Sequence, residues 1–177
     1  MKIAVYAGTF DPFTYGHLSI ARGAHALFDH VAIAIAINSK KKPLFSLSKR
    51  LLLIETYLAE CAVNPCYFER PTMPSDPGIS IQAFDGLLVQ QARDIGACAL
   101  IRGLRAVSDF DIEMGLADAN RRQCSEVQTV FLPAAAHEAF VSSSFVKELA
   151  SFADTNLNHY VNRATEDALR DALWTLT

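Results

Sequence analysis

The sequence lacks the long apolar runs and the strong charge imbalance that mark membrane proteins and many nucleic-acid-binding proteins. None of its apolar stretches approaches the ~20 residues of a membrane span. The run at the N-terminus, MKIAVYAG, is too short for a signal peptide and ends at a turn. A net charge of −3 provides no global attraction to nucleic acid or to anionic lipid. We therefore expect a cytoplasmic protein that holds any anionic ligand with local basic residues.

Cysteine is scarce and shows no metal-binding pattern. The 4 cysteines contain no C-x-x-C pair, and no histidine stands at ligand spacing from them. This usage favours reduced thiols in a reducing compartment. The sequence also has no G-x-x-x-x-G-K-[ST] loop and no G-x-G-x-x-G fingerprint. These absences argue against P-loop ATPases and ordinary dinucleotide-binding oxidoreductases.

Apolar runs alternate with segments of helical periodicity along the chain. Alternation of this kind predicts an α/β fold, a single-domain five-stranded parallel sheet with helices on both faces, over residues 1–177. We predict strands at 2–7, 31–37, 66–70, 98–102 and 127–132. We predict helices at 16–28, from Ser46 or Ser48 onward, from Phe84 to about 95, and at 109–122, 142–153 and 161–173. Residues 60–84, rich in proline, are expected to form a longer irregular segment.

Parallel sheets of this type bind ligands beyond the carboxyl ends of their strands, so the residues after each strand are the candidates for a site. The first strand is followed by GTFDPFTYGH, residues 8–17. Gly8 and Gly16 permit a close backbone approach, and a helix start offers free N–H groups to an anion. His17 lies in the first helical turn, where the helix dipole favours a neutral imidazole that can donate one hydrogen bond. Alternatively, His17 is an exposed helix-start residue without a ligand.

Basic and hydroxyl side chains follow two further strands. The segment NSKKKPLF, residues 38–45, carries three consecutive lysines, which form either a solvated loop or a phosphate clamp. The segment Ser142–Ser144 is expected to start a helix, with Lys147 one turn later. One serine suffices as a helix cap, so three in a row favour a polyphosphate ligand.

Two arginines follow the fourth predicted strand in IRGLRAVSDF, residues 101–110. Arg102 and Arg105 flank a glycine, so two forked cations lie where the backbone can bend around an anion. The alternative is that they are structural ion-pair partners of Asp109 or Asp111. Together, the ends of four strands predict a site that holds several phosphates.

Four motifs, GTFDPFTYGH, KKPLF, IRGLRAVSDFDIE and SSSFVKE, resemble in this order the bacterial phosphopantetheine adenylyltransferases. The T-x-G-H portion alone marks the wider nucleotidyltransferase superfamily. The resemblance implies a Rossmann-like fold and transfer of AMP from ATP to 4′-phosphopantetheine in coenzyme A biosynthesis. It also implies Mg²⁺ as cofactor, pyrophosphate and dephospho-CoA as products, and a homo-oligomer, namely a hexamer.

The resemblance also implies roles for individual residues, carried over by motif. Catalytic roles fall to His17, Lys41 and Arg105. The residues implied to bind ATP are Thr9, Phe10, His17, Gly103, Leu104, Arg105, Glu113, Glu138, Ala139, Phe140, Val141, Ser142, Ser143 and Ser144. The residues implied to bind 4′-phosphopantetheine are Thr9, Lys41, Leu88 and Arg102.

The chain departs from the family at three places: Tyr15 where asparagine is usual, Glu138 where an aromatic residue often stands, and the long segment 60–84.

Two other functions keep the same pocket. One is an adenylyltransferase with a nicotinate or glycerol phosphate acceptor, and the other is a nucleotide-binding regulator without catalysis. For the transfer reaction no general base is needed, because the attacking phosphate is already mostly dianionic at neutral pH.

Overall fold

The computed structural model describes residues 1–37, 42–63, 78–105, 107–135, 137–138 and 140–174. Its elements follow one another as β1 (Ile3–Gly8), α1 (Tyr15–His25), β2 (His30–Ala36), α2 (Leu47–Val63), β3 (Ile79–Phe84), α3 (Leu88–Asp94), β4 (Ala99–Leu104), α4 (Val107–Gln123), β5 (Gln128–Pro133), α5 (Ser143–Ala150) and α6 (Arg163–Trp174). The predicted α/β architecture with a five-stranded parallel sheet is confirmed. Among the described residues, none of the helices has both the length and the apolar character to cross a bilayer.

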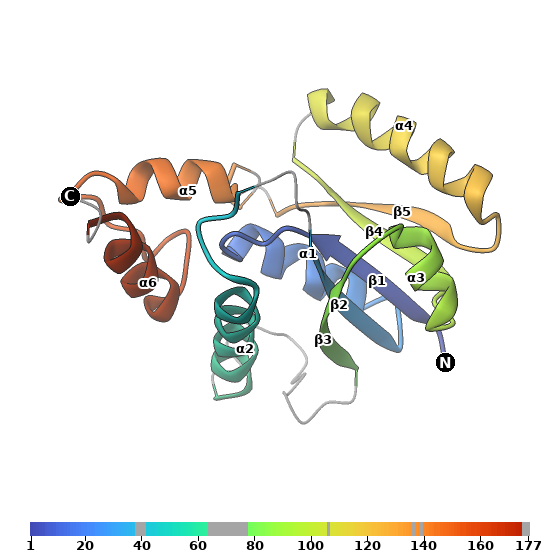
Figure 1. Cartoon of the computed structure of the whole chain (residues 1–177), viewed down its shortest axis with the longest axis horizontal. Helices are drawn as coiled ribbons and strands as arrows, with labels where there is room; N and C mark the ends of the chain where they lie inside the picture. The colour runs from blue at the N-terminus through green and yellow to red at the C-terminus, as the bar shows by residue number, and fades with distance from the viewer. Residues whose placement is uncertain (38–41, 64–77, 106, 136, 139, 175–177) are drawn as a thin grey trace.

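The strands lie in the order β3-β2-β1-β4-β5, with β1 between β2 and β4. The chain therefore builds one side of the sheet from β1 to β3 and then returns to β1 to build the other side. This reversal makes the carboxyl ends of β1 and β4 neighbours at a topological switch point, which is where open parallel sheets bind ligands. In Figure 1, α5 and α6 lie on one side of the molecule and α4 on the other.

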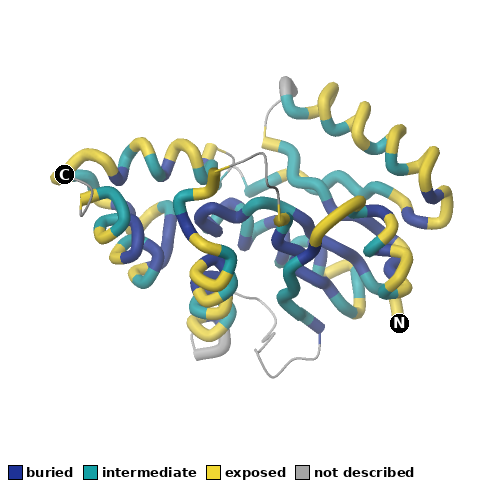
Figure 2. Tube along the Cα trace, in the orientation of Figure 1, coloured by how far each residue is buried: buried dark blue, intermediate teal, exposed yellow. Residues whose placement is uncertain are grey.

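The sheet separates two layers of apolar side chains because successive residues of a strand point to opposite faces. In β2, Ile33 and Ile35 pack with α1 and α2, whereas Ala32 and Ala34 pack with α3. The alternation VAIAIAI thus gives bulky side chains to one layer and small ones to the other. Figure 2 shows the strands at the centre of the molecule as its most deeply buried part.

The third strand is not where the sequence predicted it. Residues 66–70 lie outside the described residues, and β3 is formed by Ile79–Phe84, in register with β2 from Val31↔Ile79 onward. Phe84 ends this strand instead of starting a helix, and α3 begins at Leu88. The irregular segment proposed for 60–84 is therefore wrong at both ends, because 60–63 belong to α2 and 79–84 to β3. β3 is an edge strand of half-buried residues, so its sequence lacks the continuous apolar run of an inner strand.

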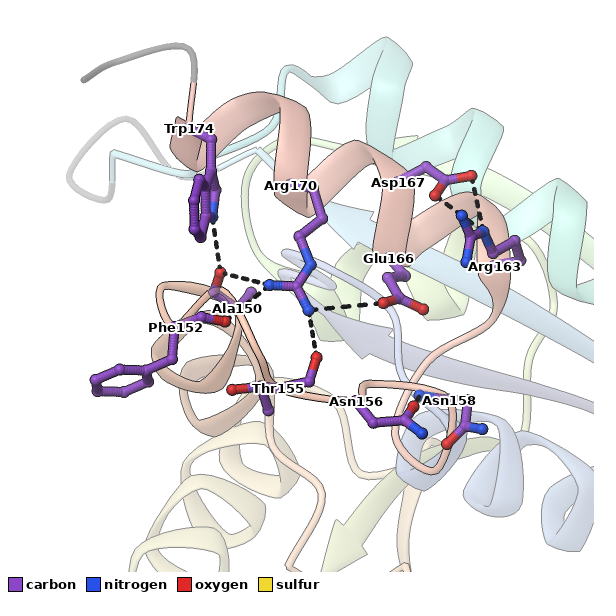
Figure 3. Close-up of polar contacts among 10 residues, drawn as sticks. All are labelled: Ala150, Phe152, Thr155, Asn156, Asn158, Arg163, Glu166, Asp167, Arg170 and Trp174. Carbon is purple, nitrogen blue, oxygen red and sulfur yellow. Dashed lines mark hydrogen bonds and ion pairs between the residues drawn. The ribbon is translucent and has the colours of Figure 1, made fainter.

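Helices α5 and α6 are tied together by one arginine (Figure 3). The Arg170 guanidinium donates to the carbonyl oxygens of Phe152 at 2.8 Å, of Ala150 at 3.5 Å and of Thr155. Trp174 Nε1 donates to the same Ala150 oxygen at 3.2 Å. The bonds to Ala150 occupy a carbonyl group at the end of α5, where intrahelical partners are lacking, and the other two hold the residues that follow this helix. These bonds fix α5, whose other end borders the cavity described next.

Candidate active site

A cavity of about 750 Å³ opens at the carboxyl ends of β1 and β4. Its wall is completed by the first turns of α1 and α5 and by the residues before α2. A volume of this size is typical of small-molecule sites. The predicted site residues that line it are Thr9, Phe10, His17, Leu88, Arg102, Gly103, Arg105, Glu113, Val141, Ser142, Ser143 and Ser144.

The structure does not bring the remaining candidates into this wall. Of the described residues, Leu104, Glu138 and Phe140 do not line the cavity. The side chain of Phe140 is 79% exposed, on the loop between β5 and α5. Lys41 and Ala139 lie outside the described residues.

The start of α1 is built around a reciprocal pair of hydrogen bonds between Thr14 and His17. Thr14 is the N-cap, and its hydroxyl accepts from the backbone N–H of His17 at 3.4 Å. In return, the backbone N–H of Thr14 donates to Nδ1 of His17 at 3.1 Å. Nδ1 must therefore be unprotonated, because it accepts a hydrogen bond. The single proton of the neutral ring is on Nε2, which leaves an N–H donor for a ligand in the cavity.

The neutral state of His17 is a consequence of its surroundings. Burial, helped by the positive charge of Arg105, lowers the pKa of the imidazole from 6.5 to about 4. The sequence predicted this direction from the helix dipole, but burial is the larger cause. The ring packs on Phe10 and Phe13 at centroid distances of 5.2 and 5.4 Å, which shields most of it from water and leaves part of it in the cavity wall. His17 is thus uncharged at neutral pH.

Glycines allow the backbone to close tightly around this histidine. A Cβ on Gly16 would lie 2.8 Å from the carbonyl oxygen of Val141 and 3.0 Å from that of Glu138. A Cβ on Gly8 would lie 2.7 Å from the ring of Phe10, whose backbone is left-handed with φ of 49°. The loop before α5 can therefore rest on the first turn of α1, as the sequence predicted for Gly16.

Arg102, within β4, and Arg105, directly after it, are both in ion pairs. Arg102 makes a two-pronged contact with Glu113 of α4, with both N···O distances at 2.6 Å. Its third nitrogen donates to the carbonyl of Ala7 at 3.2 Å, which joins α4 to the end of β1. Arg105 pairs with Asp109 at 3.3 Å, as the structural alternative anticipated. Fork-to-fork pairs hold a guanidinium in a fixed orientation, so Arg102 is placed before any ligand arrives.

The three serines have different environments. Ser142 is an ordinary helix cap, since its hydroxyl accepts from the backbone N–H of Phe145 at 3.1 Å. Ser143 donates to the carbonyl of Pro12 at 2.8 Å and so ties α5 to the loop after β1. Ser144 is exposed. The hydroxyls of Ser142 and Ser143 thus have partners within the protein. Their contribution to the site is to hold the start of α5 in place at the cavity.

Two charged residues of the site were not among the predicted functional residues. Asp11 lines the cavity and is 5% exposed, and Arg50 of α2 is 4% exposed. Arg50 donates to the carbonyl oxygens of Thr9 at 2.7 Å and Ala36 at 3.5 Å, and so joins the ends of β1 and β2. Burial lowers the pKa of the Arg50 guanidinium, and the negative charge of Asp11 opposes this effect. The sequence shows Asp11 beside the T-x-G-H motif but gives no sign of Arg50, whose contacts are distant in the chain.

The described residues do not fit a metal ion held by the protein alone. They contain no group of three or more histidine, cysteine or acidic side chains that could hold one. The two carboxylates in the cavity wall are already engaged, Asp11 with Lys147 and Glu113 with Arg102. A magnesium ion bound only through substrate phosphates needs no such cluster.

Comparison with known proteins identifies the family. The cytidylyltransferase-like family profile matches residues 5–149. The phosphopantetheine adenylyltransferase of Desulforudis audaxviator is 42% identical over 171 residues, which cover 97% of this chain and 95% of that protein. The chain belongs to the phosphopantetheine adenylyltransferase family. Another family member, from Ruegeria pomeroyi, is 41% identical over 175 residues and 98% of each chain.

The family's fold is shared more widely. The nicotinic acid mononucleotide adenylyltransferase of Plasmodium falciparum, solved in complex with NaAD, superposes with a TM-score of 0.65. The alignment covers 99% of this chain and 98% of that one, at 14% sequence identity. At this identity the likeness concerns the Rossmann-like fold, which agrees with the prediction.

Proposed function

We propose that this protein transfers AMP from ATP to the phosphate of 4′-phosphopantetheine, which yields dephospho-CoA and pyrophosphate. The observation that carries the proposal is the cavity at the ends of β1 and β4, lined by His17, two arginines and a helix start. Relatives about 40% identical over nearly the whole chain bear the name of this activity. A nicotinate or glycerol phosphate acceptor is less well supported, because the likeness to a nicotinic acid mononucleotide enzyme extends to the fold only.

The chemistry requires alignment of two anions more than acid–base catalysis. The acceptor phosphate is its own nucleophile, since its second pKa is about 6. It attacks the α-phosphorus of ATP, the bond to the β-phosphate oxygen breaks, and pyrophosphate leaves with the electron pair. Donors fixed where negative charge grows stabilise such a transition state without reorganisation. His17 suits this role through Nε2–H, and it is a poor base because its pKa is about 4.

We divide the candidate residues between the two substrates as the family resemblance implies. We assign Lys41, Leu88 and Arg102 to 4′-phosphopantetheine, and Thr9 to both substrates. The residues assigned to ATP are Phe10, His17, Gly103, Leu104, Arg105, Glu113 and 138–144. The ion pair between Arg102 and Glu113 joins the two groups of residues. Because each partner orients the other, loss of Arg102 is expected to weaken 4′-phosphopantetheine most and to have a smaller effect on ATP.

Magnesium enters this account as part of the substrate. We propose that Mg²⁺ arrives on the phosphates of ATP, since the two carboxylates of the cavity wall already have cationic partners. The chain's own contribution is to hold the anions with N–H groups and cations on the protein. Removal of Mg²⁺ should therefore weaken ATP binding and leave the melting temperature of the ligand-free protein unchanged.

We also propose that the protein acts in the cytoplasm as a homo-oligomer, with a hexamer as the family's implied form. Four large apolar side chains of α4 are 42–69% exposed, namely Phe110, Ile112, Met114 and Leu116. Figure 2 shows most of α4 as exposed, at the periphery of the molecule. Helical spacing places Phe110 and Met114 on one side of α4 and Ile112 and Leu116 on the other. Exposed apolar side chains of this size are candidates for a contact between subunits. Light scattering after size exclusion gives the mass directly, and a monomer at micromolar concentration would contradict the proposal.

Pyrophosphate release with ATP and a panel of acceptors tests the activity. Release with 4′-phosphopantetheine, and not with nicotinate mononucleotide or glycerol 3-phosphate, is the expected result. Release with one of the other acceptors alone would change the substrate assignment. ATP binding by calorimetry without release for any acceptor would favour the regulator instead.

A further inference from the structure

Asp11 is a buried carboxylate in the cavity wall for which the proposed chemistry has no use. Its Oδ1 accepts the backbone N–H of Phe45 at 2.9 Å. Its Oδ2 accepts the backbone N–H of Leu44 at 2.9 Å and the ammonium of Lys147 at 3.0 Å. Three donors therefore converge on one carboxylate that is 5% exposed.

These contacts join three parts of the wall that are far apart in sequence. Asp11 belongs to the loop after β1, Leu44 and Phe45 to the segment that leads into α2, and Lys147 to α5. The segment before α2 also places Lys42 and Pro43 in the cavity wall. Asp11 is thus the point at which the lysine-bearing segment and α5 are both attached to the end of β1.

The same arrangement solves an electrostatic problem. A carboxylate in the wall of a cavity repels phosphates bound there unless its negative charge is compensated. Here the compensation comes from two backbone N–H groups and the Lys147 ammonium, with Arg50 near enough to feel the charge of Asp11. Lys147 also lines the cavity, so it could instead meet the phosphates directly. The two roles predict different behaviour when Asp11 is changed.

We propose that Asp11 is a positioning residue for the segment before α2 and that Lys147 serves as its counter-charge. The positioning role of Asp11 rests on the proposed function, because it takes 4′-phosphopantetheine as the acceptor. The charge compensation by Lys147 requires only that the protein binds ATP. Asp11 sets the place of Lys42, which lines the cavity where the acceptor phosphate would bind. Lys147 acts on the substrates through Asp11, by cancelling a negative charge in the wall.

The role of Asp11 is tested with Asp11→Asn. The two backbone N–H groups bond different carboxylate oxygens, and in the amide one of these oxygens becomes an NH₂ group. One of the backbone donors then faces another donor and loses its hydrogen bond. Leaving one buried N–H donor unpaired in this way shifts a binding equilibrium about tenfold. We expect KM for 4′-phosphopantetheine to rise about that much, with KM for ATP changed less than about threefold. Equal changes in both KM values, or none in a folded variant, would overturn the positioning role.

The role of Lys147 is tested by a double-mutant cycle on ATP affinity, measured by calorimetry. Lys147→Met should weaken ATP about tenfold in the wild-type background, because it leaves an uncompensated carboxylate beside the phosphates. In the Asp11→Asn background, where that charge is gone, the same change should cost less than about twofold. An equal loss in both backgrounds would show that Lys147 contacts the substrate directly.

Matched variants keep the test decisive. Lys49→Met removes an exposed lysine of α2 and controls for net charge. Lys147→Arg keeps the cation and should retain ATP affinity within about threefold, which also tests the compensation if Asp11→Asn fails to fold. If Asp11→Asn does not fold, wild-type ATP affinity in Lys147→Met would overturn the charge compensation. Because the cycle uses ATP binding, it remains valid even if turnover with 4′-phosphopantetheine is not found, a result that would count against the proposed function alone.

Discussion

Replacement of His17 by glutamine should remove the acid sensitivity that this histidine gives to the fold. Glutamine suits the third position of a helix capped by threonine, since its amide oxygen can accept the backbone N–H of Thr14 as Nδ1 does. The variant therefore keeps the hydrogen-bonded start of α1 and loses the group that titrates. A comparison of the two proteins isolates the contribution of His17.

The size of the effect follows from the pKa of His17. It lies near 6.5 in the unfolded chain and is lowered to about 4 in the folded protein. Between these values the unfolded chain binds a proton that the folded protein does not, so stability rises with pH and is lost as the pH falls through this window. Between pH 7.5 and pH 5 this linkage costs the wild type about 2 kcal/mol of unfolding free energy. His17→Gln should not lose this part of its unfolding free energy, because it has no imidazole at position 17.

Urea unfolding at a series of pH values from 7.5 to 5 measures the difference. The two proteins should be closest in their pH response above pH 6.5 and diverge below it. His159→Gln, which removes an exposed histidine outside the cavity, controls for the loss of a histidine as such. If wild type and His17→Gln lost stability in parallel down to pH 5, the burial of a neutral His17 would be refuted.

Three further predictions concern the cavity wall. His17→Ala should lower kcat about 10²-fold or more in a folded protein, because it removes a donor aimed at developing charge; a near-normal kcat would make His17 a helix-start residue only. Arg102→Ala should mainly weaken 4′-phosphopantetheine and Arg105→Ala mainly ATP, as measured by calorimetry; an exclusive loss of ATP affinity in the first variant would reverse the assignment. Gly16→Ala should lower the free energy of unfolding by about 1–3 kcal/mol through the clash of its Cβ with the Val141 carbonyl, and unchanged stability in denaturant would contradict that packing.

The sequence predicted the inner strands because they are continuous apolar runs buried on both faces. In β2, VAIAIAI reads as a strand of a parallel sheet without further context. The edge strand β3, ISIQAF, has mostly half-buried residues and two polar ones, Ser80 and Gln82, so it lacks the continuous apolar run from which the inner strands were predicted. Its position is determined by pairing with β2, which is a tertiary contact.

The rule that ligands bind beyond the carboxyl ends of parallel strands predicted part of the candidate site. From the sequence alone, this rule places His17, Arg102 and the serine segment at one edge of the sheet. The contacts that hold them in place were not predictable, because the partners are distant in the chain. Asp11 and Lys147 are separated by 136 residues, and Arg50 reaches Thr9 across 41 residues. A single sequence contains no signal for such pairs.

The stereochemistry of transfer at the α-phosphorus tests the central claim most directly. Because Nδ1 of His17 accepts a hydrogen bond, Nε2 carries the proton and cannot attack phosphorus as a nucleophile. The acceptor phosphate must then displace pyrophosphate in one step. With a single diastereomer of ATPαS, the account predicts dephospho-CoA with inverted configuration at this phosphorus. Retention would show two successive displacements through an adenylylated enzyme and would contradict both the protonation of His17 and direct transfer between the two substrates.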